Sequence, residues 1–521
     1  MDNLRADSLD WAITHIRRYG DTDIFPIPFE YEAIRHSWEE LKRTISEYDL
    51  SAYEGRPHRR ILVPKQDSNF RVAVQLDPID SIVYLALAYE AADEIESMRV
   101  PVQQRVACSY RVAKDSKGSL YQESNGWDDY HSRSRELAES GDFSFVLTAD
   151  IADFYNHISH HRLRNALETA GVSHERSKNI ENILMNFTRG HSRGIPVGPS
   201  ASSLFAEACL SDVDNFLMRR GYVHTRYVDD FRIFTSSRSS CLKVIHDLTE
   251  YLYTAHRLSL QANKTRIKEV GQFIEDELID PSEIAEKSKE DRLRHLQRVI
   301  DLYEGAAAEL SETDNEAERN SLAELFVECL ESEPIHFGTL KYILRRATVL
   351  KTGLLREAVL GNLPSLAPVM REVSNYILAT TSNGYEEAVG KRLIDGLRRS
   401  ELWSLPYIQI WLNYVLILKM AGLLRDEISD LANNSAEVLG IRSQALLAKS
   451  LGYIDWVREQ KETWQNNSPW SRRAVIWSAS ALSGDELSYW LMRVQNAGDE
   501  LDKAIAASVL QQFNNSRASN I

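Results

Sequence analysis

Cysteine and long apolar runs are both scarce in this sequence of 521 residues, and each absence excludes a class of protein. The four cysteines are scattered, without the spacing of a zinc site or of a disulfide framework. No apolar run approaches the roughly 18 residues of a membrane-spanning helix, and the N-terminal residues have no apolar core of signal-peptide length. We therefore expect a reduced, cytoplasmic protein without a membrane partner.

Positive charge is also in deficit, with 61 lysines and arginines against 76 aspartates and glutamates, a net charge of −15. A protein that coats nucleic acid without sequence preference needs clustered cations, so that class is excluded. A polymerase is still allowed, because only its groove must be positive. The length suits two or three domains, and 43% hydrophobic with 26% charged residues is typical of a globular protein.

Two adjacent carboxylates, Asp229 and Asp230, stand in the middle of the stretch Tyr222–Phe234. β-branched and aromatic residues roughly alternate on either side, which predicts two short strands joined by a tight turn that carries both aspartates. Like charges this close repel each other, so the arrangement needs a reason, such as a divalent cation. For an isolated pair of aspartates, an acidic turn without function is the alternative.

A second carboxylate stretch lies upstream, where Phe143–Thr148 has the pattern of a buried strand and Asp150 follows at its end. Asp153 and the aromatic Tyr155 come shortly after it. The strand end and the hairpin together supply three carboxylates from two places in the chain. Two metal ions about 4 Å apart need such a set in phosphoryl and nucleotidyl transfer.

Four stretches resemble motifs of reverse transcriptases and occur in the order of that family. Tyr227-Val-Asp-Asp230 resembles the YxDD box, and Asp150-Ile-Ala-Asp-Phe-Tyr155 resembles the first catalytic motif. Arg193-Gly-Ile-Pro-Val-Gly-Pro-Ser200 resembles the loop that supports template and incoming nucleotide. Leu258-Ser-Leu-Gln-Ala-Asn-Lys-Thr265 resembles the box that places a lysine near the leaving pyrophosphate. A single YxDD is a weak signal, whereas four ordered boxes are a strong one.

The resemblance implies that two Mg²⁺ ions, for which Mn²⁺ could substitute, are held by Asp150, Asp229 and Asp230. Lys264 would act as the acid for pyrophosphate departure, with a surface lysine as the alternative. Tyr155 holds the position of the steric gate that excludes a ribose 2′-hydroxyl, with a core aromatic as the alternative. Asp153 would orient the triphosphate or cap the following helix. The residues assigned to the nucleotide-supporting loop are Gly194, Pro196, Val197 and Gly198.

A basic hairpin that begins near Arg56 is predicted upstream, where two apolar runs, residues 61–65 and 70–74, flank the turn Asp67-Ser-Asn69. The resemblance makes this the fingers hairpin, in which Lys65 and Arg71 would hold the triphosphate. A solvated charged face is the alternative.

Other segments have simpler interpretations. Ser8–Tyr19 and Glu30–Tyr48 are predicted as amphipathic helices, and Ile267–Glu275 as the strand that closes the palm. Asp212 and Asp214 lie on a predicted helix, and we interpret them as a solvated face.

From Pro281 onward no strand pattern appears, and the composition turns to Leu, Ala, Glu and Arg. Short loops between helices of roughly 12 to 18 residues predict antiparallel pairs stacked into an α-solenoid. The last helix is expected over residues 485–511, with Ser483 and Glu486 as its capping box.

The loop Val197-Gly-Pro-Ser200 departs from many templating reverse transcriptases, which have glutamine where Val197 stands. It is similar to the abortive-infection reverse transcriptases of phage defence, in which a HEAT-like helical domain follows the polymerase part. The resemblance therefore implies an α+β right-hand fingers-palm polymerase core followed by an all-α helical-repeat (HEAT-like) domain. We expect an N-terminal helical segment over 1–55, the fingers/palm domain over 56–280 and the helical domain over 281–521.

This lineage implies a nucleotidyltransferase that makes DNA from dNTPs in bacterial abortive-infection defence. The resemblance also implies that the enzyme works without a template and primes from a protein tyrosine, so that its single-stranded DNA would stay covalently attached. It further implies assembly into homo-oligomers. Tyr48 and Tyr53 are weak candidates for the primer. Two alternatives stay open: an RNA-templated reverse transcriptase, and a non-catalytic nucleic-acid-binding scaffold with a decayed site.

Overall fold

The computed structural model describes residues 2–65, 69–122, 126–278, 316–332, 335, 337–382, 384–398, 401–420, 422–424, 426–427 and 437–518. The chain divides into two compact units, each discontinuous in sequence. The first comprises Met1–Asp23, Ser46–His58 and Val74–Glu309, and the second comprises Ile24–Ile45, Arg59–Ala73 and Leu310–Ile521. The domain boundaries expected from the sequence stay a prediction, and the one at residue 280 lies outside the described residues.

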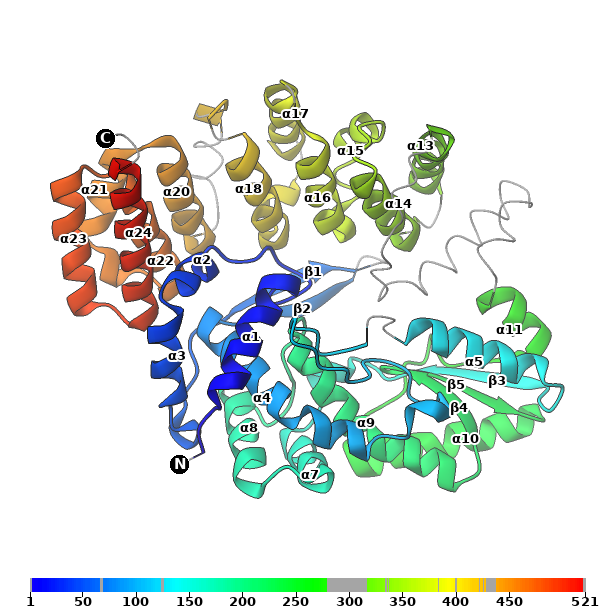
Figure 1. Cartoon of the computed structure of the whole chain (residues 1–521). Helices are drawn as coiled ribbons and strands as arrows, with labels where there is room; N and C mark the ends of the chain where they lie inside the picture. The colour runs from blue at the N-terminus through cyan, green and yellow to red at the C-terminus, as the bar shows by residue number, and fades with distance from the viewer. Residues whose placement is uncertain are drawn as a thin grey trace. The chain divides into compact units, whose positions relative to one another are not determined.

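In its described residues, the first unit combines helices with one small sheet (Figure 1). Its helices are α1 Ala6–Tyr19, η1 Leu50–Ala52, α4 Pro78–Met98, η2 Val102–Gln104, α5 Trp127–Glu139, α6 Phe154–His157, α7 His160–Ala170, α8 His174–Phe187, α9 Ser200–Arg219, α10 Arg238–Tyr251, η3 Leu252–His256 and α11 Val270–Glu277. Its strands are β3 Phe145–Asp150, β4 Val223–Tyr227, β5 Asp230–Thr235 and β6 Arg266–Glu269.

The four strands form an antiparallel sheet in the order β4-β5-β3-β6. Side chains alternate between the two faces of a strand, so the register partners Val146 and Phe234 lie on one face. There they pack with Leu137 of α5 and Phe273 of α11 in one apolar cluster. Helix α10 contacts β3 and β5 and covers the other face (Figure 1). The sheet is therefore held from both sides, which fixes the ends of β3 and β5.

Helix α4 is the central helix of the first unit and is buried along most of its length. Its sequence is apolar on all sides, which is typical of a helix enclosed by others. The side chain of Asp77 caps its first turn by accepting a hydrogen bond from the N–H of Ile79 at 3.1 Å. Helices α1, α7 and α9 pack against it.

Two sequence predictions in this unit need correction. The strand expected over Ile267–Glu275 is wrong in its second half, because β6 ends at Glu269 and α11 begins at Val270. As part of a helix, Phe273 reaches the core beside α5. The solvated face is wrong for Asp214, which is buried and accepts hydrogen bonds from Arg226 at 2.6 and 2.8 Å.

The second unit is mainly helical where it is described, with one two-stranded hairpin in those residues. Its described elements are α2 Glu30–His36, α3 Trp38–Ser46, β1 Arg59–Pro64, β2 Phe70–Gln75, α13 Glu316–Glu331, α14 Phe337–Val349, α15 Arg356–Gly361, η5 Ala367–Val369, α16 Met370–Thr380, α17 Glu386–Arg398, η6 Glu401–Ser404, α18 Pro406–Lys419, α20 Glu437–Leu451, α21 Ile454–Glu462, η7 Trp464–Asn466, α22 Pro469–Ser478, η8 Ala479–Ala481, α23 Gly484–Ala497 and α24 Glu500–Ala518. Strand β2 continues into the first unit at Val74.

The helices of the second unit pack in sequence, α14 against α16, then α18, α20, α22 and α24. The hairpin contacts α18 through β1, and α2 contacts α24. Arg442 on α20 joins the N-terminal segment to the helices by donating to Glu30 at 2.6 and 2.8 Å. Its guanidinium also stacks on the rings of Phe29 and Trp470. Segment Ile24–Ile45 is thereby part of the helical unit.

Two helix predictions in this unit are wrong in their bounds. The helix expected over Glu30–Tyr48 is interrupted at Ser37, which separates α2 from α3. The helix expected over residues 485–511 is two helices, α23 and α24, on either side of Gly498. The capping box is also absent: the Ser483 side chain makes no capping bond, and the Glu486 carboxylate accepts from Arg458 instead.

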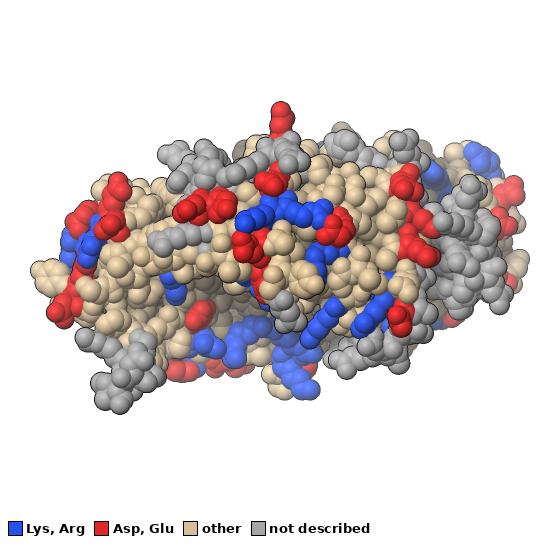
Figure 2. Space-filling view, turned by 90° about the horizontal axis from the view of Figure 1, so that it is seen from above, with Lys and Arg blue, Asp and Glu red and all other residues tan. Residues whose placement is uncertain are grey.

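Within the described ranges, every helix is too short or too polar to span a bilayer. The face shown in Figure 2 carries both acidic and basic side chains, with uncharged residues between them.

Candidate active site

Three carboxylates meet where β3 ends and β5 begins. Asp150 is the last residue of β3 and Asp230 the first of β5, and the two are register partners in the antiparallel ladder. Register partners project from the same face of a sheet, so both carboxylates leave it on one side. The N–H of Ile151 donates to the carbonyl oxygen of Asp229 at 3.3 Å, which ties the third aspartate to the end of β3. The structure therefore brings together the three aspartates that the sequence singled out.

The turn between β4 and β5 contains only Val228 and Asp229. Its first residue, Val228, has a φ of +54°. Two-residue hairpin turns require positive φ at this place, and glycine or asparagine usually supplies it. A β-branched residue is strained in that conformation, and such strain persists only where the surroundings hold it.

Lys264 is held against the same strand end. The N–H of Gln261 donates to the carbonyl oxygen of Asp150 at 2.7 Å, and the N–H of Lys264 donates back to Gln261 at 3.1 Å. The Lys264 Nζ then donates to Asp150 Oδ2 at 2.7 Å. Burial alone would lower the pKa of Lys264, but its hydrogen bond to Asp150 and the neighbouring carboxylates raise it above the ordinary value. The side chain is therefore an ammonium that can donate a proton.

Electrostatic repulsion is concentrated on Asp230. Desolvation and the charges of Asp229 and Asp150 raise the pKa of Asp230 to about 8. The residue is also exposed at the surface, and the water that reaches it weakens this shift without changing its direction. Without a partner cation, the folded protein therefore favours a proton on this carboxyl group.

A divalent cation would relieve the same repulsion, since a bound metal is often the largest charge in a site. All three candidate ligands are carboxylates, and hard oxygen ligands are those that Mg²⁺ prefers. No group of three or more His, Cys, Asp or Glu side chains in the described part of the chain is already arranged as a metal centre. In the structure, Asp150 forms an ion pair with the Lys264 ammonium. The three aspartates therefore fit a divalent cation for two reasons: they supply oxygen ligands, and a cation would relieve the repulsion between their charges.

The loop Arg193–Ser200 packs against the segment that follows Asp150. The N–H of Ile195 donates to the carbonyl oxygen of Tyr155 at 2.9 Å, and the N–H of Gly194 donates to that of Ile158 at 2.8 Å. Gly194 has a φ of +93°, and a Cβ there would lie 3.2 Å from the carbonyl oxygen of Asn156. Glycine is therefore required for the loop to approach so closely.

The next loop residues connect to β2. The carbonyl oxygen of Val197 accepts a hydrogen bond from the N–H of Val74 at 3.0 Å. Pro196 is buried, whereas Val197 and Gly198 are half-buried. At Gly198 the φ is +124°. The structure thus brings these loop residues beside the first catalytic motif.

Tyr155 is half-buried beside the aspartates, and its hydroxyl donates to Ser203 Oγ on α9 at 3.4 Å. Burial, with the neighbouring Tyr110 and Asp229, raises the pKa of Tyr155 well above its ordinary value, so the phenol stays neutral. Asp153 is exposed and accepts from Asn156 Nδ2 at 2.8 Å. Its side chain makes no capping bond to α6, so the capping alternative is wrong for that helix.

Lys65 and Arg71 are exposed residues on the β1–β2 hairpin. Both belong to the second unit, whereas the three aspartates belong to the first. Their contact with a triphosphate stays a prediction. The turn residues Asp67 and Ser68 lie outside the described residues.

Sequence reasoning missed two layers around the aspartates. The first is aromatic: the ring of Tyr227 lies 4.8 Å from Trp127 and 6.4 Å from Tyr110. The second is a buried charged cluster that includes Glu207 and Arg226. A charged residue inside an apolar helix or a β-branched strand is the only sequence signal for the second layer.

Residues 63–296 match the family model described as "Reverse transcriptase (RNA-dependent DNA polymerase)". The chain therefore contains a reverse transcriptase domain, and the protein is a nucleotidyltransferase that polymerises DNA. Reverse transcriptase domains generally use divalent metal ions, and proteins with this domain bind nucleic acid and nucleotides. The four aligned motifs and the assembled carboxylates lie inside the matched residues.

Solved structures of telomerase show a weak similarity. Telomerase from Candida albicans with a TWJ fragment of telomeric RNA has a TM-score of 0.30 and 14% identity, covering 76% of this chain and 72% of that one. Apo telomerase from Candida tropicalis has a TM-score of 0.32 and 11% identity, covering 74% of this chain and 72% of that one. Scores this low support no argument about fold or activity. No curated protein matches the chain.

Proposed function

We propose that this protein makes DNA from dNTPs without a template and from a protein primer, in bacterial abortive-infection defence against phage. The observation that carries the catalytic part is the meeting of Asp150 with Asp229 and Asp230 at the end of β3. The Lys264 ammonium at 2.7 Å from Asp150 adds a proton donor to the same place. A binding scaffold with a decayed site would lack one of these groups, and none is missing.

The proposed reaction joins a primer hydroxyl oxygen to the α-phosphorus of a dNTP and breaks the bond from that phosphorus to the oxygen bridging to the β-phosphate. The hydroxyl proton leaves to water, and the departing pyrophosphate takes a proton from Lys264. Two Mg²⁺ ions, or Mn²⁺, would be held by the three aspartates and would supply positive charge at the attacking and leaving oxygens.

Tyr155 is proposed as the steric gate that selects deoxyribose. Its half-buried ring is held by the hydroxyl contact to Ser203 and by the backbone bond from Ile195, so the ring has little freedom to move aside. A ribose 2′-hydroxyl would need the space that the ring fills. Asp153, exposed at the start of α6, is proposed to orient the triphosphate.

Untemplated synthesis is supported by Val197, which has no side-chain hydrogen-bonding group where many templating enzymes carry glutamine. The long helical unit supports the same reading, because its sequential helix packing suits a HEAT-like repeat domain. We propose that this domain takes the place of a duplex-tracking thumb and that the enzyme works as a cytoplasmic homo-oligomer.

The primer would be a tyrosine, to which the single-stranded product stays attached. Tyr53 is poorly suited, because its hydroxyl donates to Asp80 at 2.5 Å and accepts from Arg56 at 2.8 Å. Burial and the Asp80 charge also raise the pKa of Tyr53 well above its ordinary value, which keeps the hydroxyl protonated and therefore a poor nucleophile. The Tyr48 hydroxyl accepts from Arg56 as well. In the described part of the chain, the most exposed tyrosines are Tyr489, Tyr253 and Tyr385.

Sequencing of the product tests the proposal. Purified protein is given all four dNTPs and Mg²⁺, with and without a defined RNA. We expect base composition that follows nucleotide supply in both reactions, and a 5′ end on a tyrosine peptide by mass spectrometry. Reads complementary to the RNA, with free 5′ ends, would support the second candidate, an RNA-templated reverse transcriptase, which the description of the matching family favours.

A further inference from the structure

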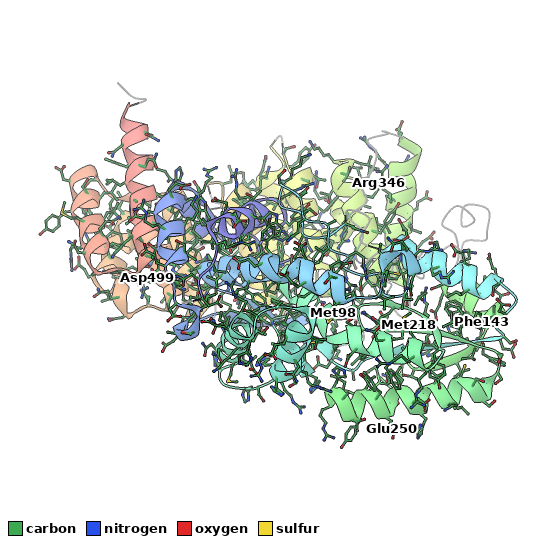
Figure 3. All side chains as sticks on the ribbon, turned by 60° about the horizontal axis from the view of Figure 1, so that its bottom comes forward. Met98, Phe143, Met218, Glu250, Arg346 and Asp499 are labelled. Atoms are coloured by element: carbon green, nitrogen blue, oxygen red, sulfur yellow. The ribbon has the colours of Figure 1, made fainter. Side chains whose placement is uncertain are left out.

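A buried cluster of four charged side chains lies behind the turn that carries Asp229. Its members, which we call the turn cluster, are Arg99, Glu207, Asp214 and Arg226. Their exposed fractions are 4%, 0%, 1% and 0%, and their two positive and two negative charges balance. They come from the residue after α4, from α9 and from β4. Figure 3 labels Met98 at the end of α4 and Met218 on α9, the two helices that contact each other here.

Glu207 is the centre of the turn cluster. Its carboxylate accepts from Arg99 Nη2 at 2.7 Å, from Arg226 Nη2 at 3.0 Å and from Ser109 Oγ at 2.5 Å. Arg226 also donates to Asp214, and this pair holds the pKa of Asp214 well below its ordinary value despite burial, which alone would raise it. Each of the four residues has at least two hydrogen bonds within the cluster or to its neighbours.

Both backbone polar groups of Val228, its N–H and its C=O, are hydrogen-bonded to the turn cluster, one of them through Ser109. The N–H of Val228 donates to Ser109 Oγ at 2.8 Å, so the serine hydroxyl passes the bond on to Glu207. The carbonyl oxygen of Val228 accepts from Arg226 Nη1 at 2.8 Å. Val228 is the residue with a φ of +54°, directly before Asp229. The strained residue of the turn is thus bonded to the cluster through its N–H and its C=O.

A second strained residue is tied to the same cluster. Tyr110 has a φ of +49°, and its carbonyl oxygen accepts from Arg99 Nη1 at 2.9 Å. Arg99 Nη2 donates in addition to the carbonyl oxygen of Ser109 at 2.7 Å. The segment that supplies the serine hydroxyl is therefore itself fixed in place.

Stability alone does not account for such a cluster. Replacing buried ion pairs by well-packed apolar residues is often neutral or stabilising, so a buried charged network has to be explained by what it positions. Here the hydrogen bonds converge on the backbone of one residue, Val228, and the conformation of that residue sets where the next one, Asp229, lies relative to Asp150. The gain is geometric: catalytic groups misplaced by about 1 Å can cost about 100-fold in rate.

We propose that Ser109 is a positioning residue, which with the turn cluster holds Val228 in its left-handed conformation and so sets Asp229 against Asp150. This inference rests on the proposed nucleotidyl transfer at the aspartates. It assigns to the buried serine and to Glu207 a role in catalysis that needs no contact with substrate.

The test compares Ser109→Ala with Ser211→Ala in the full-length protein. Ser211 is a matched control, because it is a buried serine on α9, one turn from Glu207, that loses only a bond to the Met98 carbonyl oxygen. We expect Ser109→Ala to lower kcat for dNTP incorporation by about 10- to 100-fold with little change in KM. Hydrogen exchange of the peptide spanning residues 222–234 should become faster, while the control matches the wild type in both measurements.

Val228→Gly separates positioning from general support. Glycine adopts positive φ without strain, so in the Ser109→Ala background it should restore at least part of kcat. No restoration, or equal effects of Ser109→Ala and Ser211→Ala, would overturn the proposal. If the wild type incorporates no nucleotide with Mg²⁺ or Mn²⁺, the proposed function fails, and the exchange of residues 222–234 still decides whether Ser109 holds the turn.

Discussion

Replacing Asp230 by asparagine should stabilise the protein in the absence of a divalent cation, and only at the higher end of the pH range. Desolvation and the charges of Asp229 and Asp150 raise the pKa of Asp230 to about 8 in the folded chain, against about 3.9 for an unfolded aspartate. Between these values the folded protein binds more protons than the unfolded protein. Its stability therefore falls as the pH rises from about 4 to 8.

The size of the effect follows from the same shift. Each pKa unit corresponds to about 1.4 kcal/mol, but the side chain is exposed and solvent screens most of the repulsion. After that discount we expect Asp230→Asn to gain about 1 kcal/mol at pH 8, a rise of about 2–4 °C in Tm for a unit of this size. At pH 4 the folded carboxyl is protonated and the unfolded one is only about half ionised, so the difference between the variant and the wild type should be small.

Thermal unfolding in EDTA at pH 4 and pH 8 measures this difference. Asp153→Asn is the control, because Asp153 is an exposed aspartate directly before helix α6. Mn²⁺ added in excess of EDTA at pH 8 should make the wild type the more stable of the two proteins. The ion stabilises the folded state that binds it, and the variant lacks the Asp230 ligand. An Asp230→Asn protein that is less stable than the wild type at pH 8 in EDTA would refute the reasoning about repulsion.

Three further predictions concern single side chains. Asp150→Asn and Asp229→Asn should each abolish dNTP incorporation while leaving the circular dichroism spectrum and Tm near those of the wild type. If either variant still polymerises DNA, the aspartate that it replaces is not a metal ligand. Tyr155→Ala should lower the preference for dNTPs over rNTPs in competition assays, and an unchanged ratio would make Tyr155 a core residue only. Arg442→Met should lower stability by about 3–5 kcal/mol because Glu30 is left buried without its ion pair. Adding Glu30→Gln should recover most of the loss, and an undamaged Arg442→Met protein would contradict that account.

The sequence predicts the parts of the site that depend on local pattern. The alternation around Asp229 and Asp230 predicts the β4–β5 hairpin, although only Asp229 lies in the turn and Asp230 begins β5. The apolar run before Asp150 predicts β3, which the structure places two residues later than expected, over Phe145–Asp150. The pattern of apolar and polar residues predicts secondary structure less well where the same residues suit both a strand and a helix. The stretch Ile267–Glu275 contains β-branched and aromatic residues, yet α11 begins at Val270 because its Phe273 packs beside α5.

Contacts between distant segments lie beyond such patterns. Asp214 resembles an ordinary charged residue on a helix, and it is buried because Arg226 on β4 pairs with it. Glu486 stands at the right spacing for a capping box, but its carboxylate instead accepts a hydrogen bond from Arg458 on α21. In each case the arginine that pairs with the carboxylate comes from a distant segment that only the fold brings near. The sequence could therefore show at most that a charged residue stands at an unexpected position.

Labelling of the protein itself tests the central claim most directly. Purified wild-type protein and Asp229→Asn are incubated with α-labelled dNTPs and Mg²⁺, without nucleic acid, and run on a denaturing gel. We predict label that migrates with the wild-type protein and survives heat and detergent, and that is absent from Asp229→Asn. Nuclease should remove all of this label except that on the first nucleotide, which is bonded to the protein. Label that appears only on an added primer annealed to RNA, with none on the protein, would contradict protein-primed, untemplated synthesis.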